Sequence, residues 1–180
     1  VAEMLRWPDN EYRRTECLLA DNHLAQMWIA LGRREAAAEV LAHDAGGVAD
    51  RFYGRRLTLR LRWQRLFGTP DAALRDELQA LAARVASPFN RTLMELELSR
   101  HLPPAQALPL LAMLHGSAVV LQRPGLQLHA AVLAAQAAAA LGLAGDAALY
   151  LDSARNLAQR CAPFDMPRAE VQALLDGAPA

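Results

Sequence analysis

The sequence predicts an all-α fold of stacked helical hairpins, and a recurring signature is the main observation behind this prediction. A glycine followed within a few residues by an acidic residue and two alanines occurs three times, at Gly32, Gly68 and Gly142. The first two glycines are 36 residues apart and the last two 74, close to twice that step. Each glycine separates two stretches with helical apolar periodicity. Such spacing is typical of helical-hairpin arrays, so one degenerate unit is expected between Gly68 and Gly142.

Composition supports a helical fold and excludes several kinds of chemistry. Hydrophobic residues make up 53% of the 180 residues and charged residues 21%, as is typical of a soluble protein with closely packed, alanine-rich helices. The formal net charge is zero, so no bulk charge favours direct nucleic-acid binding or an anionic membrane. All 19 basic residues are arginine, which excludes a phosphate-loop lysine and a lysine Schiff base. We expect no cofactor.

The first hairpin is predicted over residues 10–43. Its first helix runs from about Asp9, which can cap the start, to Leu31, and Gly32 permits the reversal that follows. The partner helix covers residues 34–43. Apolar residues at steps of three and four predict the inward stripe of the first helix: Cys17, Ala20, Leu24, Met27, Trp28 and Leu31.

The second hairpin is predicted over residues 50–85, with one helix on either side of Gly68. The segment Thr69-Pro70-Asp71 is typical of a helix start. It offers a capping hydroxyl, a proline in the first turn and an acidic side chain at the positive end of the helix.

The third hairpin, residues 89–121, is the least regular. Pro103-Pro104 ends its first helix, and Pro109 follows five residues after Pro104. A proline inside a helix costs about 3 kcal/mol. The sequence therefore leaves two starts open for the second helix, one at Pro104 and one at Pro109.

The fourth hairpin, residues 124–162, is the most regular. Its first helix is rich in alanine, so neighbouring helices can approach it closely. A last short helix at 167–176 is expected to cap the exposed end of the stack. The whole chain, residues 1–180, is thus predicted to be one repeat domain.

The hairpin units resemble tetratricopeptide repeats. That family has a small residue and an aromatic before the joint glycine and an alanine after it. The first unit matches at Ala25, Trp28, Gly32 and Ala37. The second unit keeps Gly68 and Ala73, and the fourth keeps Ala135, Gly142 and, after one inserted residue, Ala148. The resemblance covers about residues 10–162 and implies a right-handed α-α superhelix.

The run from Ala30 to Ala36 and the run from Ala139 to Gly142 are similar to the carboxy-terminal repeat regions of large bacterial transcription activators of the maltose-regulator type. In that family the repeat region receives an inducer or a regulatory protein, while ATP hydrolysis and DNA binding belong to other domains. The resemblance implies a bacterial, cytoplasmic regulator. The start at Val1 rather than methionine suggests a fragment of a longer protein.

Four arginines on the helix at 50–67 are the strongest candidates for partner binding. Arg51, Arg55, Arg62 and Arg65 fall within about 80° of arc on a helix. Arginine binds carboxylates and phosphates in bidentate fashion, so these residues are predicted to contact an acidic peptide or another anion. The alternative is a solvated face paired with acids of neighbouring helices. Trp28 is a second candidate for partner contact. Trp63, Tyr53 and Tyr150 are, with Trp28, candidates to line a ligand groove, and core packing is the alternative for these aromatic residues.

Three histidines invite a metal-site hypothesis that their spacing does not support. His101, His115 and His129 are 14 residues apart, and no pair has the one-turn spacing that places two ligands on one helical face. We expect isolated histidines and no metal. The segment His115-Gly116-Ser117 lacks the second glycine of a nucleophile elbow.

Two further features are interpreted as structural. Cys17 and Cys161 lie within apolar stripes and are expected to be buried free thiols. Gly46-Gly47 is expected to be a loop, because no phosphate-binding fingerprint surrounds it.

The sequence as a whole predicts a non-catalytic interaction or effector-sensing module whose partner is a protein, a peptide or a small inducer. One alternative is a self-association module that forms a homodimer through the alanine-rich fourth hairpin. The other is an α-helical enzyme domain whose carboxylates come together from distant helices.

Overall fold

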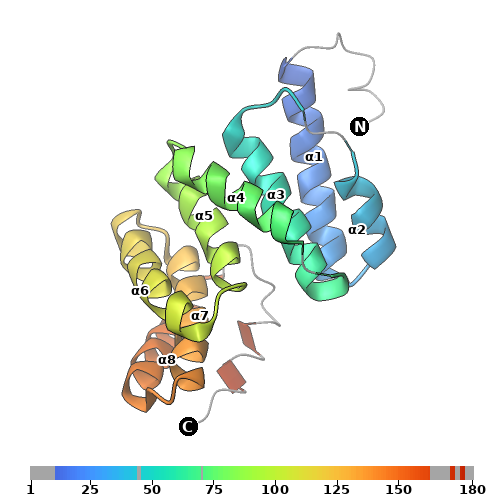
Figure 1. The fold of residues 1–180 in the computed structure, drawn as a ribbon. Coiled ribbons are helices and arrows are strands. Elements are labelled where there is room, and N and C mark those ends of the chain that lie inside the picture. The colour runs from blue at the N-terminus through green and yellow to red at the C-terminus, as the bar shows by residue number, and fades with distance from the viewer. Residues whose placement is uncertain (1–10, 44–45, 70, 163–170, 173–174, 177–180) are drawn as a thin grey trace. The chain divides into compact units, whose positions relative to one another are not determined.

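The chain forms helices and no strand within the residues that the computed structural model describes, which are 11–43, 46–69, 71–162, 171–172 and 175–176 (Figure 1). The all-α prediction is therefore confirmed. The helices group into two compact units, named here the N-terminal unit (Val1–Met94) and the C-terminal unit (Glu95–Ala180). A single repeat domain over residues 1–180, wound as a right-handed superhelix, stays a prediction.

The N-terminal unit contains the first two predicted hairpins. Its helices are α1 (Glu11–Ala30), α2 (Arg34–Leu41), α3 (Asp50–Phe67), α4 (Ala72–Arg84) and the first part of α5 (Pro88–Ser99). Helix α3 packs against α1, α2 and α4 (Figure 1), so it joins the first hairpin to the second. The buried core where α1, α2 and α3 meet consists of Ala25, Ile29, Ala37, Leu41 and Leu59.

The predicted inward stripe of α1 is wrong. Met27 and Leu31 from that stripe are exposed, and its other members are half-buried. The residues of α1 that are buried are Leu18, Asp21, Asn22, Ala25 and Ile29. They also recur at steps of three and four, but two of them are polar. A search for apolar periodicity therefore selects the face of α1 beside the buried one, because polar residues interrupt the buried face.

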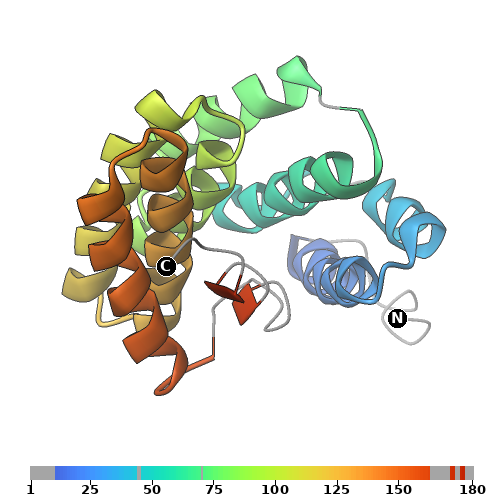
Figure 2. The same cartoon turned by 90° about the horizontal axis from the view of Figure 1, so that it is seen from below.

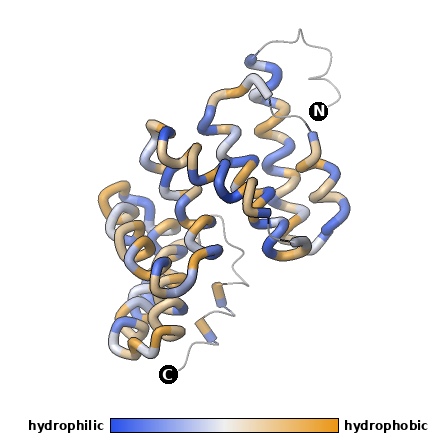
Figure 3. Tube along the Cα trace, in the orientation of Figure 1, coloured by the Kyte–Doolittle hydropathy of each residue, from blue (hydrophilic) through white to orange (hydrophobic). Residues whose placement is uncertain are grey.

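The C-terminal unit centres on an alanine-rich helix. Its helices are the end of α5, α6 (Pro104–Val120), α7 (Pro124–Ala140) and α8 (Ala144–Ala158). Helix α7 packs against both α6 and α8, and Figure 2 shows these helices from a second side. Six of the eleven buried residues of α7 are alanine, which permits the close approach that the sequence predicted. Figure 3 shows the apolar residues along α6 and α7 and the more hydrophilic course of α3.

The helix ends at Gly32 and Gly142 share one backbone arrangement. Both glycines have positive φ, 67° and 72°. In each case the N–H of the next residue donates to the carbonyl five residues before it, at 2.8 and 3.0 Å. This pattern is the Schellman motif. Gln122 ends α6 with the same hydrogen bonds and a φ of 52°, although the sequence offered no glycine there.

Gly68, the remaining glycine of the recurring signature, has a different role. Gly68 lies between α3 and α4 with extended backbone, φ −127° and ψ −157°. A Cβ at this position would lie 3.1 Å from Cζ3 of the Trp63 ring. Close approach of an aromatic ring, rather than positive φ, thus favours glycine here, and the glycine recurrence has two physical causes.

Two helix starts are settled by the structure. Asp71, and not Thr69, caps α4, because its carboxylate accepts backbone N–H groups of the first turn at 2.9 and 3.3 Å. Helix α6 begins at Pro104 and contains Pro109 in its interior. The carbonyl that loses its partner to Pro109 belongs to Ala105, and both residues are exposed. Water can therefore hydrate this carbonyl, which lowers the cost of the proline.

Two predicted features lie wholly or mostly outside the described residues. One is the Asp9 cap of the first helix. The other is the capping helix at 167–176, of which Val171 and Leu175 are described as helical and buried. Within the described ranges, no helix combines the length and the apolar character that crossing a bilayer needs.

Candidate functional site

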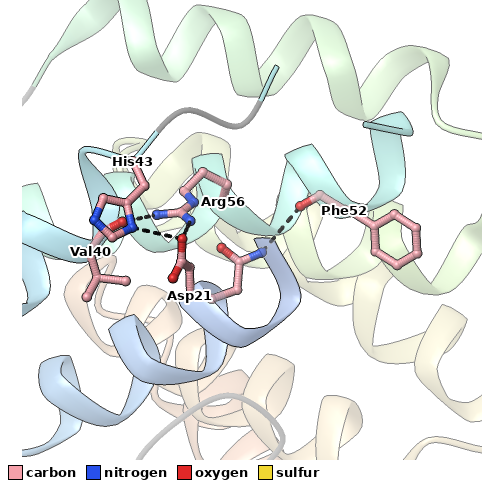
Figure 4. Close-up of polar contacts among 6 residues, drawn as sticks. Asp21, Val40, His43, Phe52 and Arg56 are labelled. Carbon is pink, nitrogen blue, oxygen red and sulfur yellow. Dashed lines mark hydrogen bonds and ion pairs between the residues drawn. The ribbon is translucent and has the colours of Figure 1, made fainter. Parts of the chain in front are cut away.

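A buried ion pair links three helices of the N-terminal unit. The guanidinium of Arg56 on α3 donates from Nη2 to Oδ2 of Asp21 on α1 at 3.5 Å (Figure 4). It also donates from Nη1 to the carbonyl of Val40 on α2 at 2.6 Å. Arg56 is 1% exposed and Asp21 7%. Arg56 therefore binds both helices of the first hairpin at once.

The charge of Arg56 sits in an unfavourable environment. Burial lowers the pKa of its guanidinium from the ordinary value, and the neighbouring Asp21 carboxylate opposes that shift. Arginine stays protonated in such a setting because its intrinsic pKa is so high. Desolvation of a buried ion costs several kcal/mol, and Nε of Arg56 has no hydrogen-bond partner in the described part of the chain. The guanidinium thus depends on Asp21 and the Val40 carbonyl.

His43 extends the ion pair toward the surface. Its Nδ1 lies 3.0 Å from Oδ2 of Asp21, the same oxygen that Arg56 contacts (Figure 4). A carboxylate only accepts hydrogen bonds, so Nδ1 carries the proton that it donates to Asp21. The His43 side chain is 55% exposed. Asp21 therefore holds both the buried arginine and a histidine in contact with solvent.

A pocket of about 400 Å³ opens beside this cluster. It lies between the end of α2, the loop that follows and one face of α3. Its described lining includes two arginines, a histidine, a tyrosine and two loop glycines: Arg56, Arg60, His43, Tyr53, Gly46 and Gly47. The remaining lining residues are Leu41, Ala42 and Val48. The volume lies within the range of small-molecule sites. This α2–α3 pocket is the candidate site.

A smaller pocket of about 190 Å³ continues along the same two helices. Arg60 lines both pockets, and Trp63 and Gln64 line the smaller one. The indole Nε1 of Trp63 donates to the carbonyl of Arg34 at 3.0 Å, and the Arg34 guanidinium lies 5.9 Å from the centre of the Trp63 ring. These contacts fix the indole as a wall of the smaller pocket.

The four arginines predicted for partner binding do not share one environment. Arg51 is exposed and lies over the ring of the adjacent Phe52, 4.6 Å from its centre. Arg55 is half-buried and donates to Oε1 of Gln26 at 2.8 Å. Arg65 is half-buried, whereas Arg62 is only 5% exposed. Their role in binding stays a prediction, and burial separates Arg62 from a partner-contacting surface.

The aromatic candidates divide between the core and the pockets. Trp28 and Trp63 pack against the core cluster of α1, α2 and α3, which agrees with the core alternative stated for Trp28. Its contact with a partner stays a prediction. The hydroxyl of Tyr53 donates to Oε1 of Glu77 at 2.7 Å, and the residue lines the larger pocket. Tyr150 contacts the His115 ring in the C-terminal unit.

The histidines and cysteines lie in separate surroundings. Nε2 of His101 lies 3.8 Å from Glu97, His115 contacts Ser153, and Nε2 of His129 lies 3.2 Å from the Arg100 guanidinium. In the part of the chain that the structure describes, no three His, Cys, Asp or Glu side chains gather as metal ligands would. Cys17 and Cys161 are free thiols, but both are half-buried rather than buried. Burial raises the pKa of the Cys161 thiol.

The sequence prediction named Tyr53 as a candidate groove residue but did not select the charged residues that line the pocket. Arg60 was outside the chosen arc, and Gly46-Gly47, correctly predicted as a loop, was not linked to a site. One signal was available. Asp21 continues the step of Leu18 and Ala25 along α1, and a carboxylate on an otherwise apolar stripe indicates a buried partner of opposite charge.

No protein-family model matches the chain, and no curated protein or solved structure gives a significant match.

Proposed function

We propose that this chain is a non-catalytic binding module that senses a small effector within a bacterial, cytoplasmic transcriptional regulator. The observation that carries the proposal is the α2–α3 pocket, which is lined by arginine and histidine and has the volume of a small-molecule site. A module of this kind acts by changing the population of its conformations when the effector binds.

Helix packing supports the repeat architecture on which the regulator assignment depends. In the N-terminal unit, α3 contacts both helices of the preceding hairpin. In stacked arrays each repeat packs on its neighbour in this way. In the C-terminal unit, α7 likewise contacts the helices before and after it. These contacts favour a tetratricopeptide-like stack, and with the resemblance of the joint segments they favour the regulator.

The chemistry of the pocket favours binding over catalysis, although one feature suits an enzyme. The Asp21–His43 pair places an oriented imidazole beside a pocket, as in enzymes that use histidine as a general base. However, the described lining contains no serine, threonine or cysteine that could act as a nucleophile. Asp21 is also engaged by Arg56, so it serves to hold a buried cation.

The proposal is tested by thermal unfolding of the chain with a panel of sugars, sugar phosphates, dicarboxylates and amino acids. A compound present at about 100 times its Kd stabilises the folded chain by about 2.7 kcal/mol, which raises Tm by several degrees. Mass spectrometry then recovers the compound unchanged. Chemical turnover of the compound, or the absence of any stabilising compound, would reject the proposal.

Two matched variants locate the effect. Ala42→Trp fills part of the pocket and removes the stabilisation, whereas Ala80→Trp on the exposed face of α4 retains it. A compound that stabilises both variants equally binds elsewhere on the chain.

Self-association is the second candidate, and exposed apolar side chains of the C-terminal unit favour it. Val120 on α6 is 83% exposed and Leu149 on α8 is 71% exposed. Light scattering across a hundredfold dilution distinguishes the candidates. A dimer that persists on dilution and dissociates in Leu149→Glu supports self-association, whereas a monomer leaves the binding module as the function.

A further inference from the structure

We infer that the ligand of the α2–α3 pocket is a small anion, a molecule with a phosphate or carboxylate group, and that Arg60 and His43 bind this group. The inference rests on the proposed function, because it names the class of effector for the same pocket. It deepens that proposal by assigning the charged contacts to two residues.

Arg60 supplies the unpaired positive charge. Its side chain is exposed on α3, and it lines both the larger and the smaller pocket. Within the described residues its guanidinium has no hydrogen-bond or ion-pair partner. Guanidinium groups bind carboxylates and phosphates through paired, charge-assisted hydrogen bonds. Arg60 is therefore poised to hold an anion at the place where the two pockets join.

His43 supplies a second donor with a fixed orientation. The hydrogen bond from Nδ1 to Asp21 holds the ring by one nitrogen and leaves Nε2 for a ligand (Figure 4). When the ring is protonated, both nitrogens donate at once, so Nε2–H can bind an anion while Nδ1–H still binds Asp21. Asp21 thus positions the His43 ring without lining the pocket itself.

The charges of the described lining residues favour a negatively charged ligand. Arg56, which belongs to the lining, is neutralised by Asp21, and Arg60 adds one positive charge. No carboxylate belongs to the described lining; Glu77 is bound to the hydroxyl of Tyr53 at one edge.

The loop after α2 packs against an arginine of α1. Gly47 has a φ of 69°, a conformation that other residues rarely adopt. A Cβ there would lie 3.2 Å from Nε of Arg14, so the Arg14 side chain packs directly against this glycine. The loop therefore brings a further guanidinium from α1 close to the lining.

The volume restricts the size of the anion. About 400 Å³ fits a metabolite-sized molecule, whereas an extended peptide needs a longer groove. A phosphorylated or carboxylated metabolite places its charged group on Arg60 and His43, and the apolar side chains of Leu41 and Val48 contact the rest of it.

The test is a calorimetric and NMR titration of the chain at constant ionic strength, with inorganic phosphate and with succinate as separate probes. We expect saturable binding of at least one probe, and the stronger of the two identifies the phosphate or the carboxylate class. The amide signals of Val48 and Tyr53 should shift during the titration. Arg60→Gln should weaken binding about tenfold or more, because a charge-assisted hydrogen bond to the anion is lost. His43→Gln should weaken it less.

Arg155→Gln is the matched control, since Arg155 is an exposed arginine on α8 that does not line the pocket. Its affinity should equal that of the unmodified chain, and circular dichroism should show all three variants folded. The inference is overturned if neither probe saturates or if Arg60→Gln binds as tightly as the unmodified chain. Should a neutral compound stabilise the chain and shift the same amides while both anions fail, only the anion inference falls and the binding module stands.

Discussion

In the N-terminal unit a buried arginine lies where three helices meet, whereas in the C-terminal unit the central helix α7 is lined by alanine. Arg56 joins α1, α2 and α3 by polar contacts, and a pocket of about 400 Å³ opens beside it. Small side chains on α7 instead let α6 and α8 pack closely. Helical hairpins of the same type can therefore enclose either a polar interior with a pocket or a compact apolar interior.

Side-chain size and charge on the inner face of a hairpin thus determine whether a site can form. A long, charged side chain must bring its own partners into the interior, and Arg56 does so with Asp21 and the Val40 carbonyl. Alanine requires no partner and leaves little space. Substitutions that alter one property of one unit at a time test this contrast.

The largest effect is expected from removal of the partner of Arg56. Asp21→Ala leaves a guanidinium buried without a counter-charge, which should lower the free energy of unfolding by about 3 kcal/mol or more. Both tryptophans that the structure describes, Trp28 and Trp63, belong to the N-terminal unit, and the C-terminal unit contains none in its sequence. Urea unfolding followed by tryptophan fluorescence therefore measures the loss in that unit.

A double variant separates the charge from the packing. Asp21→Ala combined with Arg56→Met removes both charges, so it should recover much of the stability lost in Asp21→Ala alone. If Asp21→Ala unfolds at the same urea concentration as the unmodified chain, the ion pair does not support the N-terminal unit, and the contrast between the two interiors fails.

The next effect tests the close packing around α7. Ala134 is fully buried, so Ala134→Leu should lower the free energy of unfolding by about 2 kcal/mol through overpacking. Ala140 lies on the same helix and is exposed, so Ala140→Leu should change the free energy of unfolding by much less. Urea unfolding followed by circular dichroism compares the two variants. Equal stability of both would mean that α7 has unfilled space beside it.

Two glycines of the C-terminal unit, one at a helix joint and one inside a helix, offer a smaller effect. Gly142 has a φ of 72°, and a methyl group added there would meet open space, so Gly142→Ala should cost about 1 kcal/mol through backbone strain alone. Gly116 lies within α6 and also has open space, so Gly116→Ala should instead stabilise the chain by about 0.5–1 kcal/mol. Thermal unfolding of the pair measures the difference, and a loss in both would contradict the assigned conformations.

The helices could be predicted from the sequence because local signals mark them. Glycine and proline bound most of the predicted segments, and the helices lie within a few residues of their predicted limits. The face of α1 could not be predicted, since Asp21 and Asn22 are buried by partners on α3. Burial of a polar residue depends on such distant partners, which apolar periodicity does not record.

The pocket could not be predicted because its lining comes from separate segments that only folding brings together. His43 follows α2, Gly47 lies in a loop, and Arg60 lies on α3. The sequence shows that the helix at 50–67 is rich in arginine. The packing of α3 against α1, α2 and α4 determines which of its arginines are buried. The angular positions of residues on one helix do not predict this packing.

The smallest effect concerns a polar contact in the C-terminal unit. Nε2 of His115 on α6 lies 3.3 Å from Oγ of Ser153 on α8 and 3.2 Å from Nε2 of Gln127 on α7. The Gln127 amide nitrogen only donates, so Nε2 of His115 accepts and the neutral ring fits this site. Burial lowers the pKa of His115 below its ordinary value. In the folded chain, therefore, the ring resists protonation.

The sign of the pH effect follows from that shift. Above about pH 6.5 the ring is neutral in both the folded and the unfolded chain, and the shift contributes nothing. As the pH falls below that value the unfolded chain gains a proton more readily, so the free energy of unfolding decreases. His115→Gln lacks the titrating imidazole, so its free energy of unfolding should fall less than that of the unmodified chain between pH 7.5 and 5. Urea unfolding followed by circular dichroism measures both proteins. Parallel pH profiles for the two proteins would show that protonation of His115 does not destabilise the interior around α7.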